Sequence, residues 1–279
     1  FVYIALGLAG PGGPAALLGS QCGDDVGTER PIELRTVSDT FAKFLAHEVL
    51  PWVANHPQIT AKYPNFRFTD DPAGRATQGV SSGGAAAFKN TFLTPDLFGI
   101  AISYSGAFVE ENPGALNPWN LTTADFWVPP PDGQGLIMAE PLKKGRYSLA
   151  VGSHDEGSEK ACMGAPGCML TSQMPKSSNP YNNFVLGNKR TFEALTKKGY
   201  QTRFTYALDA CHAEFQMVYQ DLPNAYIWAW AEWKEKHGTG TTEWKTKQDD
   251  DTTASIGHPS GEWPLVMPVC SNGCGALVC

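Results

Sequence analysis

The chain has 279 residues, of which 42% are hydrophobic and 18% charged, and a formal net charge of −7. This composition is typical of an ordinary globular protein with a large core, in one large domain or two small ones. The negative charge, the lack of basic clusters longer than a pair and the lack of apolar runs near 18 residues give no reason to expect a nucleic-acid partner or a membrane span.

Strand-like and helix-like segments alternate along the chain. Strands are expected at 1–6, 75–80, 98–104, 147–151 and 202–207, and helices at 39–50 (with Ser38 as N-cap), 188–198 and 223–236. Alternation of this kind predicts an α/β fold with a mainly parallel sheet flanked by helices. We expect one domain over 1–237, with excursions at about 110–144 and 156–183 that either line a functional site or are surface loops. An irregular cysteine-containing tail follows over 238–279.

A Gly-x-Ser-x-Gly pattern, Gly-Val-Ser-Ser-Gly, runs from Gly79 to Gly83 between an expected strand and a helix-forming run. This strand–turn–helix context is typical of a nucleophile elbow, with Ser81 as the nucleophile. The two glycines are expected to stand where side chains would clash on the tight turn. The N–H of Ser82, at the start of the helix, would stabilise a developing negative charge. The alternative is a turn of small residues without a catalytic role.

A second oxyanion donor is expected from the glycine-rich loop at 7–13, which follows the first expected strand. The N–H of Leu8 is the first candidate and that of Ala9 the second. The alternative is a phosphate-binding loop, but Gly-x-x-x-x-Gly-Lys is absent from the sequence.

Of six histidines, His212 lies in the loop after the last expected strand and before a closing helix, where a general base is expected. His154 also follows a strand. The other histidines lie in polar or helical surroundings, where surface or packing roles are the simpler interpretation (His47, His56, His237 and His258).

Asp155 lies just past the preceding strand and is the candidate for the acid that orients His212. The chain order is then Ser81, Asp155, His212. Glu156, Glu159 and Asp209 are competitors, and Asp155 could instead serve only as a turn residue.

Seven cysteines include Cys162 and Cys168, which flank a short loop, and three in the tail (Cys270, Cys274 and Cys279). With a glycosylation sequon at 120–122, they favour a secreted or otherwise oxidising location; free thiols in a cytoplasmic protein are the alternative. We also consider a Cys22–Cys211 disulfide, because both residues lie on loops at the predicted active-site face.

Several segments resemble a known family. The run RPIELRTVSDTFAKFLAHEVLPW at 30–52 and the run DPAGRATQGVSSGGAAAF at 71–88 are similar to the helix and elbow segments of esterase D and enterochelin esterase-like α/β-hydrolases. PDLF at 95–98, SYSGAF at 103–108 and GSHD at 152–155 continue the resemblance, which covers about 1–236. It implies an α/β-hydrolase fold with Ser81, Asp155 and His212 as nucleophile, acid and base.

The chain departs from that family in three ways. The strand expected at 1–6 corresponds to the third of the usual fold, so the first two are missing or lie outside this chain. The excursion at 117–131 is longer than the family leads us to expect, and the tail has no counterpart.

We therefore expect a serine hydrolase that cleaves small-molecule carboxylic esters through an acyl-enzyme intermediate and needs no metal or organic cofactor. An acyltransferase, a serine peptidase and an inactive binding protein remain alternatives. Trp119, Phe126 and Trp127 are expected to form an apolar rim or lid that favours aromatic or lipid-like acyl groups, or else a small satellite core under a long loop.

Overall fold

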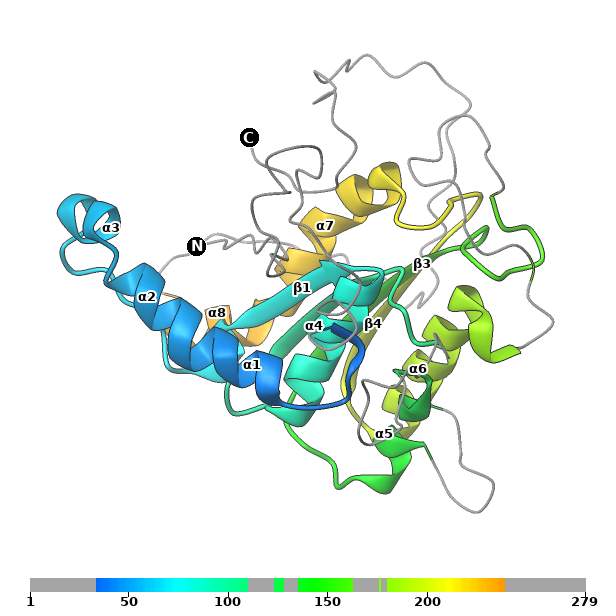
Figure 1. Cartoon of the computed structure of the whole chain (residues 1–279), viewed down its shortest axis with the longest axis horizontal. Helices are drawn as coiled ribbons and strands as arrows, with labels where there is room; N and C mark the ends of the chain where they lie inside the picture. The colour runs from blue at the N-terminus through cyan, green and yellow to red at the C-terminus, as the bar shows by residue number, and fades with distance from the viewer. Residues whose placement is uncertain (1–33, 110–122, 128–134, 163–175, 177–179, 239–279) are drawn as a thin grey trace, which may run out of the picture.

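The computed structural model describes residues 34–109, 123–127, 135–162, 176 and 180–238. These residues form a four-stranded parallel sheet in the order β1-β2-β3-β4, flanked by helices (Figure 1). The strands are β1 (Ala76–Val80), β2 (Ile100–Tyr104), β3 (Arg146–Gly152) and β4 (Gln201–Ala207). The predicted α/β fold with a parallel sheet is confirmed, and each of these strands lies within two residues of its expected range. The strand expected at 1–6 lies outside the described residues.

Alternate residues of each strand point to opposite faces of the sheet, and helices pack against both faces. Tyr147, Leu149 and Val151 of β3 pack into one core cluster with the aromatic side chains of α4 (Ser82–Leu93) and α6 (Phe184–Lys198). The short α5 (Leu136–Ala139) lies against α6 on the same side. On the other face, Ile100 and Ile102 of β2 pack against α7 (Phe215–Ala229). Both surfaces of the central strands β2 and β3 are therefore buried, whereas β1 is half-buried.

The helix expected at 39–50 is present but is longer and interrupted. It consists of α1 (Thr40–Phe44), a π-helical segment (Leu45–Val49) and α2 (Leu50–Ala54), and α3 (Pro57–Lys62) continues away from the sheet (Figure 1). Pro51 has no N–H to donate to the preceding turn, and a π-helical turn just ahead of it accommodates that loss. The N-cap is Asp39, whose side chain makes no capping hydrogen bond, so the expected cap at Ser38 is wrong.

The helix expected at 223–236 is two helices, α7 and α8 (Ala231–His237), which meet at Trp230. Pro223 lies inside α7 and does not begin it. The missing proline N–H is tolerated because Met217, Ala225 and Ala229 of α7 are buried against the sheet. Tertiary packing thus overrides the local preference of proline for the first turn.

A buried polar cluster fixes α7 to the sheet. The carboxylate of Asp221 accepts hydrogen bonds from the Tyr104 hydroxyl (2.9 Å), the Thr205 hydroxyl (2.7 Å) and two guanidinium nitrogens of Arg203 (2.6 and 3.0 Å). Burial, and then the charge of Asp221, raise the pKa of Tyr104 far above its usual range, so this phenol stays neutral. The cluster holds the middle of α7 against β2 and β4.

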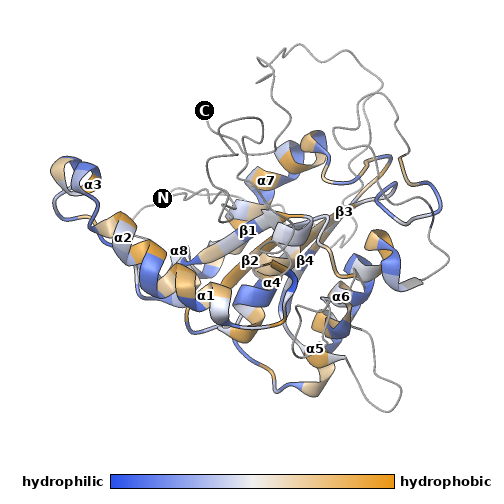
Figure 2. Cartoon of the chain, viewed as in Figure 1, coloured by the Kyte–Doolittle hydropathy of each residue, from blue (hydrophilic) through white to orange (hydrophobic). Residues whose placement is uncertain are grey.

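The described residues also include three short 3₁₀ turns (Pro72–Gly74, Thr123–Phe126 and Pro180–Asn182). Within the described ranges, no helix is both long and apolar enough to cross a bilayer. The helices around the sheet instead mix hydrophobic and hydrophilic residues, as expected for elements with one buried side (Figure 2).

Candidate active site

Ser81 occupies the turn between β1 and α4 in a backbone conformation that non-glycine residues rarely adopt (φ 58°, ψ −125°). Its N–H donates to the Tyr104 carbonyl (2.9 Å), and its carbonyl accepts from the N–H groups of Ala85 (3.1 Å) and Ala107 (3.0 Å). The strained conformation is therefore held from the sheet, from the helix and from the loop after β2. The strand–turn–helix context expected for Ser81 is present.

The glycines around Ser81 have different roles. A Cβ on Gly79 would lie 2.2 Å from the Gly83 carbonyl oxygen, so the turn closes only with glycine at position 79. A Cβ on Gly83 would meet nothing within 4 Å, so the clash expected there is absent. Gly84 instead allows α4 to approach β2, since its Cβ would lie 2.7 Å from Ser103 Oγ and 3.0 Å from the Tyr104 carbonyl oxygen.

Asp155 and His212 form a buried hydrogen-bonded pair. Asp155, in the turn after β3, is fully buried, and His212, in the loop between β4 and α7, is 5% exposed. The Nδ1 atom of His212 lies 2.5 Å from Asp155 Oδ1, which also accepts the N–H of Glu156 (2.7 Å). The edge of the His212 ring meets the Phe184 ring, with centroids 4.8 Å apart. These contacts set the orientation of the imidazole, and a donating Nδ1–H leaves Nε2 as a base.

The three residues follow the ends of β1, β3 and β4, which lie at one edge of the parallel sheet. Val80 is in register with Tyr104, and Gly152 with Ala207. In parallel α/β sheets, this carboxyl edge is where functional residues gather. Ser81, Asp155 and His212 therefore follow strand ends at the same edge of the sheet.

The loop after β2 links the Ser81 turn to the His212 loop. The N–H of Ala107 donates to the Ser81 carbonyl, and Ser105 Oγ accepts the N–H of Ala213 (3.0 Å), the residue after His212. Segment 103–108 was expected only to continue the family resemblance, with no role in the site. The signal was a pair of small residues, Gly106 and Ala107, directly after a buried strand.

The competing acidic residues have other contacts. Asp209 lies 3.5 Å from His154 Nε2 and has a positive φ of 58°, as a turn residue would. Glu159 is exposed and lies 3.3 Å from Lys176 Nζ. Glu156 is buried beside Asp155 but donates its N–H to that carboxylate. Asp155 Oδ1, in contrast, lies 2.5 Å from His212 Nδ1.

The remaining described histidines lie away from this edge of the sheet. They belong to the π-helical segment before α2, the start of α3 and the end of α8 (His47, His56 and His237). His258 lies outside the described residues.

Ser82 is the first residue of α4, where backbone N–H groups have no acceptor within the helix. Its hydroxyl is buried and accepts a hydrogen bond from Arg35 Nε (3.2 Å). Arg35 was not singled out from the sequence, which carries no local signal for a contact with a residue 47 positions away. Leu8 and Ala9, the expected second oxyanion donors, lie outside the described residues.

Two of the residues expected to form the apolar rim, Phe126 and Trp127, have different surroundings. Phe126 is fully buried and contacts the Phe88 and Phe92 rings (centroids 4.9 and 5.4 Å apart), so it belongs to the core and not to an exposed rim. Trp127 is half-buried, and its Nε1 donates a hydrogen bond to the Phe108 carbonyl (2.8 Å). The centroids of the Trp127 and Tyr181 rings are 5.9 Å apart. Trp119 lies outside the described residues.

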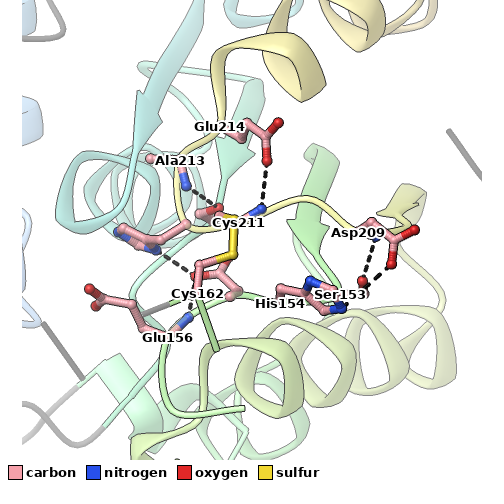
Figure 3. The surroundings of a disulfide bond; sticks show 11 residues. Ser153, His154, Glu156, Cys162, Asp209, Cys211, Ala213 and Glu214 are labelled. Atoms are coloured by element: carbon pink, nitrogen blue, oxygen red, sulfur yellow. Dashed lines mark hydrogen bonds and ion pairs between the residues drawn. A yellow bond between two sulfur atoms is a disulfide. The ribbon is translucent and has the colours of Figure 1, made fainter. Parts of the chain in front are cut away.

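A disulfide joins Cys162 to Cys211, the residue before His212 (Figure 3). Cys162 follows Asp155 by seven positions, so the bond connects the loop after β3 to the loop after β4. The Cys22–Cys211 pairing considered from the sequence is therefore wrong, because Cys211 has another partner. The other cysteines (Cys22, Cys168, Cys270, Cys274 and Cys279) lie outside the described residues.

Comparison with protein families matches residues 11–205 to the family described as "Putative esterase". This range includes Ser81 and Asp155. Among solved structures, an enterochelin esterase from Shigella flexneri is similar at 18% identity and a TM-score of 0.43, with 74% of this chain and 40% of that chain covered. A ferulic acid esterase is similar at 18% identity and a TM-score of 0.39, with 68% and 61% covered. The chain thus spans about two fifths of the enterochelin esterase, and comparison with curated proteins gives no match.

Proposed function

Because the chain belongs to the esterase family described as "Putative esterase", we propose that it hydrolyses carboxylic esters through an acyl-enzyme formed on Ser81. The observation that carries this proposal is the 2.5 Å contact between His212 Nδ1 and Asp155 Oδ1, at the edge of the sheet where the strained Ser81 turn lies. A base oriented by a buried carboxylate is the arrangement that activates a serine hydroxyl.

In the first half-reaction, His212 Nε2 takes the proton of the Ser81 hydroxyl as Oγ attacks the ester carbonyl carbon. The Asp155 carboxylate stabilises the imidazolium that forms. The N–H of Ser82 donates to the oxyanion, and the N–H of Leu8 is proposed as the second donor. When the tetrahedral intermediate collapses, the proton on Nε2 passes to the leaving alkoxide, which departs as an alcohol.

In the second half-reaction, His212 takes a proton from water, and the resulting hydroxide attacks the Ser81 ester. The carboxylic acid leaves and the proton returns to Ser81 Oγ, so that the enzyme is unchanged. Replacing water by an alcohol or a sugar turns the same steps into acyl transfer, and replacing the ester by an amide turns them into peptide cleavage. We therefore propose a small-molecule ester as substrate and treat these two reactions as outcomes of the test.

The test is hydrolysis of p-nitrophenyl acetate by the wild type and by Ser81→Ala, Asp155→Asn and Ser158→Ala variants. Ser81→Ala is expected to lower kcat by about 10⁴-fold or more, and Asp155→Asn by about 10²- to 10⁴-fold with little change in KM. Ser158→Ala is the matched control, since Ser158 Oγ is buried and has no hydrogen-bond partner among the described residues.

Retention of activity by Ser81→Ala would refute the proposal. A wild type that neither turns over the ester nor is labelled by a fluorophosphonate would instead favour the inactive binding protein. Product analysis with added alcohol separates acyl transfer from hydrolysis, and a peptide panel tests for proteolysis. We also propose a secreted or otherwise oxidising location, which the Cys162–Cys211 disulfide supports.

A further inference from the structure

The loop that carries His212 has little regular structure to hold it. It runs between β4, which ends at Ala207, and α7, which begins at Phe215. Two of its non-glycine residues, Asp209 and Ala213, have positive φ values of 58° and 54°. Such conformations are strained and persist only where the surroundings impose them. The position of His212 therefore depends on contacts from other parts of the chain.

Besides the contact of His212 with Asp155, three hydrogen bonds of the loop backbone tether it to the rest of the site among the described residues. The Asp209 N–H donates to Ser153 Oγ (2.8 Å), the His154 N–H to the Ala210 carbonyl (2.9 Å) and the Ala213 N–H to Ser105 Oγ (3.0 Å). Figure 3 shows the first and the last of them on either side of the disulfide. The residue directly before His212, Cys211, makes none of these three, and its N–H donates within the loop to Glu214 Oε2 (2.7 Å).

The disulfide is formed by Cys211, the residue directly before His212. Cys211 is bonded to Cys162 with Cα atoms 5.7 Å apart, and the N–H of Cys162 donates to the His154 carbonyl (3.1 Å), next to Asp155. Both cysteines are buried, at 8% and 5% exposure. One covalent bond thus connects the backbone beside the acid to the backbone beside the base, across 49 residues of sequence.

We propose that the Cys162–Cys211 disulfide is a positioning bond for His212, which keeps its imidazole aligned between Asp155 and Ser81. This inference rests on the proposed esterase function. Loss of the bond releases the backbone beside His212, and the imidazole then spends less time in the orientation in which Nδ1 meets Asp155. The turnover rate falls because misplacement of a catalytic group by about 1 Å can cost 10²-fold, whereas binding of the ester changes little.

The first experiment compares the wild type with Cys162→Ala, Cys211→Ala and the double variant. Each should lower kcat by about 10- to 100-fold with KM within about twofold, and the double variant should resemble the singles because one bond is lost in all three. Asp155→Asn should cost less in the double-variant background than in the wild type, since the alignment it disrupts is already lost. Ala161→Ser, next to Cys162, retains the bond and should retain kcat.

Peptide mapping of the wild type under non-reducing conditions should recover the Cys162–Cys211 linked peptide, and circular dichroism should show each variant folded at the assay temperature. If the variants do not fold, wild-type enzyme is reduced with a phosphine and water, which yield two thiols and a phosphine oxide. The kcat should then fall in step with the Cys211 thiol that forms.

Four results would overturn the inference: free Cys162 and Cys211 thiols in active wild type, folded cysteine variants with wild-type kcat, a change confined to KM, or unchanged kcat after reduction of Cys211. An equal cost of Asp155→Asn in both backgrounds would count against alignment as the cause. A wild type that hydrolyses no ester refutes the proposed function instead, so the two failures are distinguishable.

Discussion

The two glycines of the Gly-x-Ser-x-Gly pattern are predicted to respond in opposite ways to replacement by alanine. A Cβ on Gly79 would lie 2.2 Å from the Gly83 carbonyl oxygen and 2.3 Å from its carbonyl carbon. Both atoms belong to backbone, so no side chain can move aside. A Cβ on Gly83 meets nothing within 4 Å and lies in the first turn of α4.

The expected magnitudes follow from these contacts. Gly79→Ala must displace the elbow backbone, and we expect it to lower the free energy of unfolding by about 3 kcal/mol. At roughly 2–4 °C per kcal/mol, the Tm falls by about 6–12 °C. Gly83→Ala removes glycine from a helix at no steric cost and is expected to raise the free energy of unfolding by up to about 1 kcal/mol. Gly84→Ala should be destabilising, since its Cβ would lie 2.7 Å from Ser103 Oγ.

The assay is urea unfolding followed by circular dichroism, together with kcat for p-nitrophenyl acetate below the Tm of each variant. Gly79→Ala is expected to lose activity even where it remains folded, because the Ser81 turn moves with the backbone. Equal destabilisation by Gly79→Ala and Gly83→Ala, or a wild-type Tm for Gly79→Ala, would refute the reasoning from the elbow geometry.

Three further predictions concern residues around the sheet. The Tyr147 hydroxyl is buried without a hydrogen-bond partner among the described residues, so Tyr147→Phe should raise the free energy of unfolding by about 1 kcal/mol at pH 7. Burial raises the pKa of Tyr147 well above 10.0; the stability linked to this shift is present below about pH 10 and is lost at higher pH as the unfolded phenol ionises. Tyr147→Phe should therefore flatten the alkaline loss of stability in urea unfolding, and an unchanged pH profile would contradict this. Asp221→Asn breaks the paired hydrogen bonds with Arg203 and should cost about 3–5 kcal/mol in urea unfolding; a loss below about 1 kcal/mol would show that the cluster is not needed. Trp127→Ala should lower kcat/KM about 10-fold more for aromatic acyl esters than for acetyl esters, and an equal change for both would remove Trp127 from the acyl site.

Many of the candidate site residues could be predicted from the sequence because the patterns that indicate them span only a few residues. Ser81 sits in a pentapeptide whose strand and helix neighbours are recognisable, and Asp155 and His212 each follow a short apolar run. Parallel strands bring their carboxyl ends to one edge of the sheet, so the order of these residues along the chain also places them on one face. The hydrogen-bonding contact between Asp155 and His212 is consistent with that order.

Contacts between residues far apart in the sequence were harder to predict. A pattern of cysteines does not state which sulfur atoms meet, and the partner of Cys211 proved to be Cys162 instead of Cys22. Phe126 lies in an irregular segment that resembles a surface excursion, yet its ring fills the core. Pro223 resembles a helix start, but packing against the sheet carries α7 through it.

The sequence by itself therefore determined the α/β class, the strands and the identities of a candidate nucleophile, acid and base, since apolar periodicity and turn chemistry act over a few residues. The tertiary structure decided where a side chain in place of a glycine would clash, which loop lies between the Ser81 turn and the His212 loop, and which cysteine is bonded to Cys211. These depend on the exact path of the backbone and on contacts between distant segments, such as the 49 residues that separate Cys162 from Cys211, and they are set by how helices and strands pack and not by any local pattern.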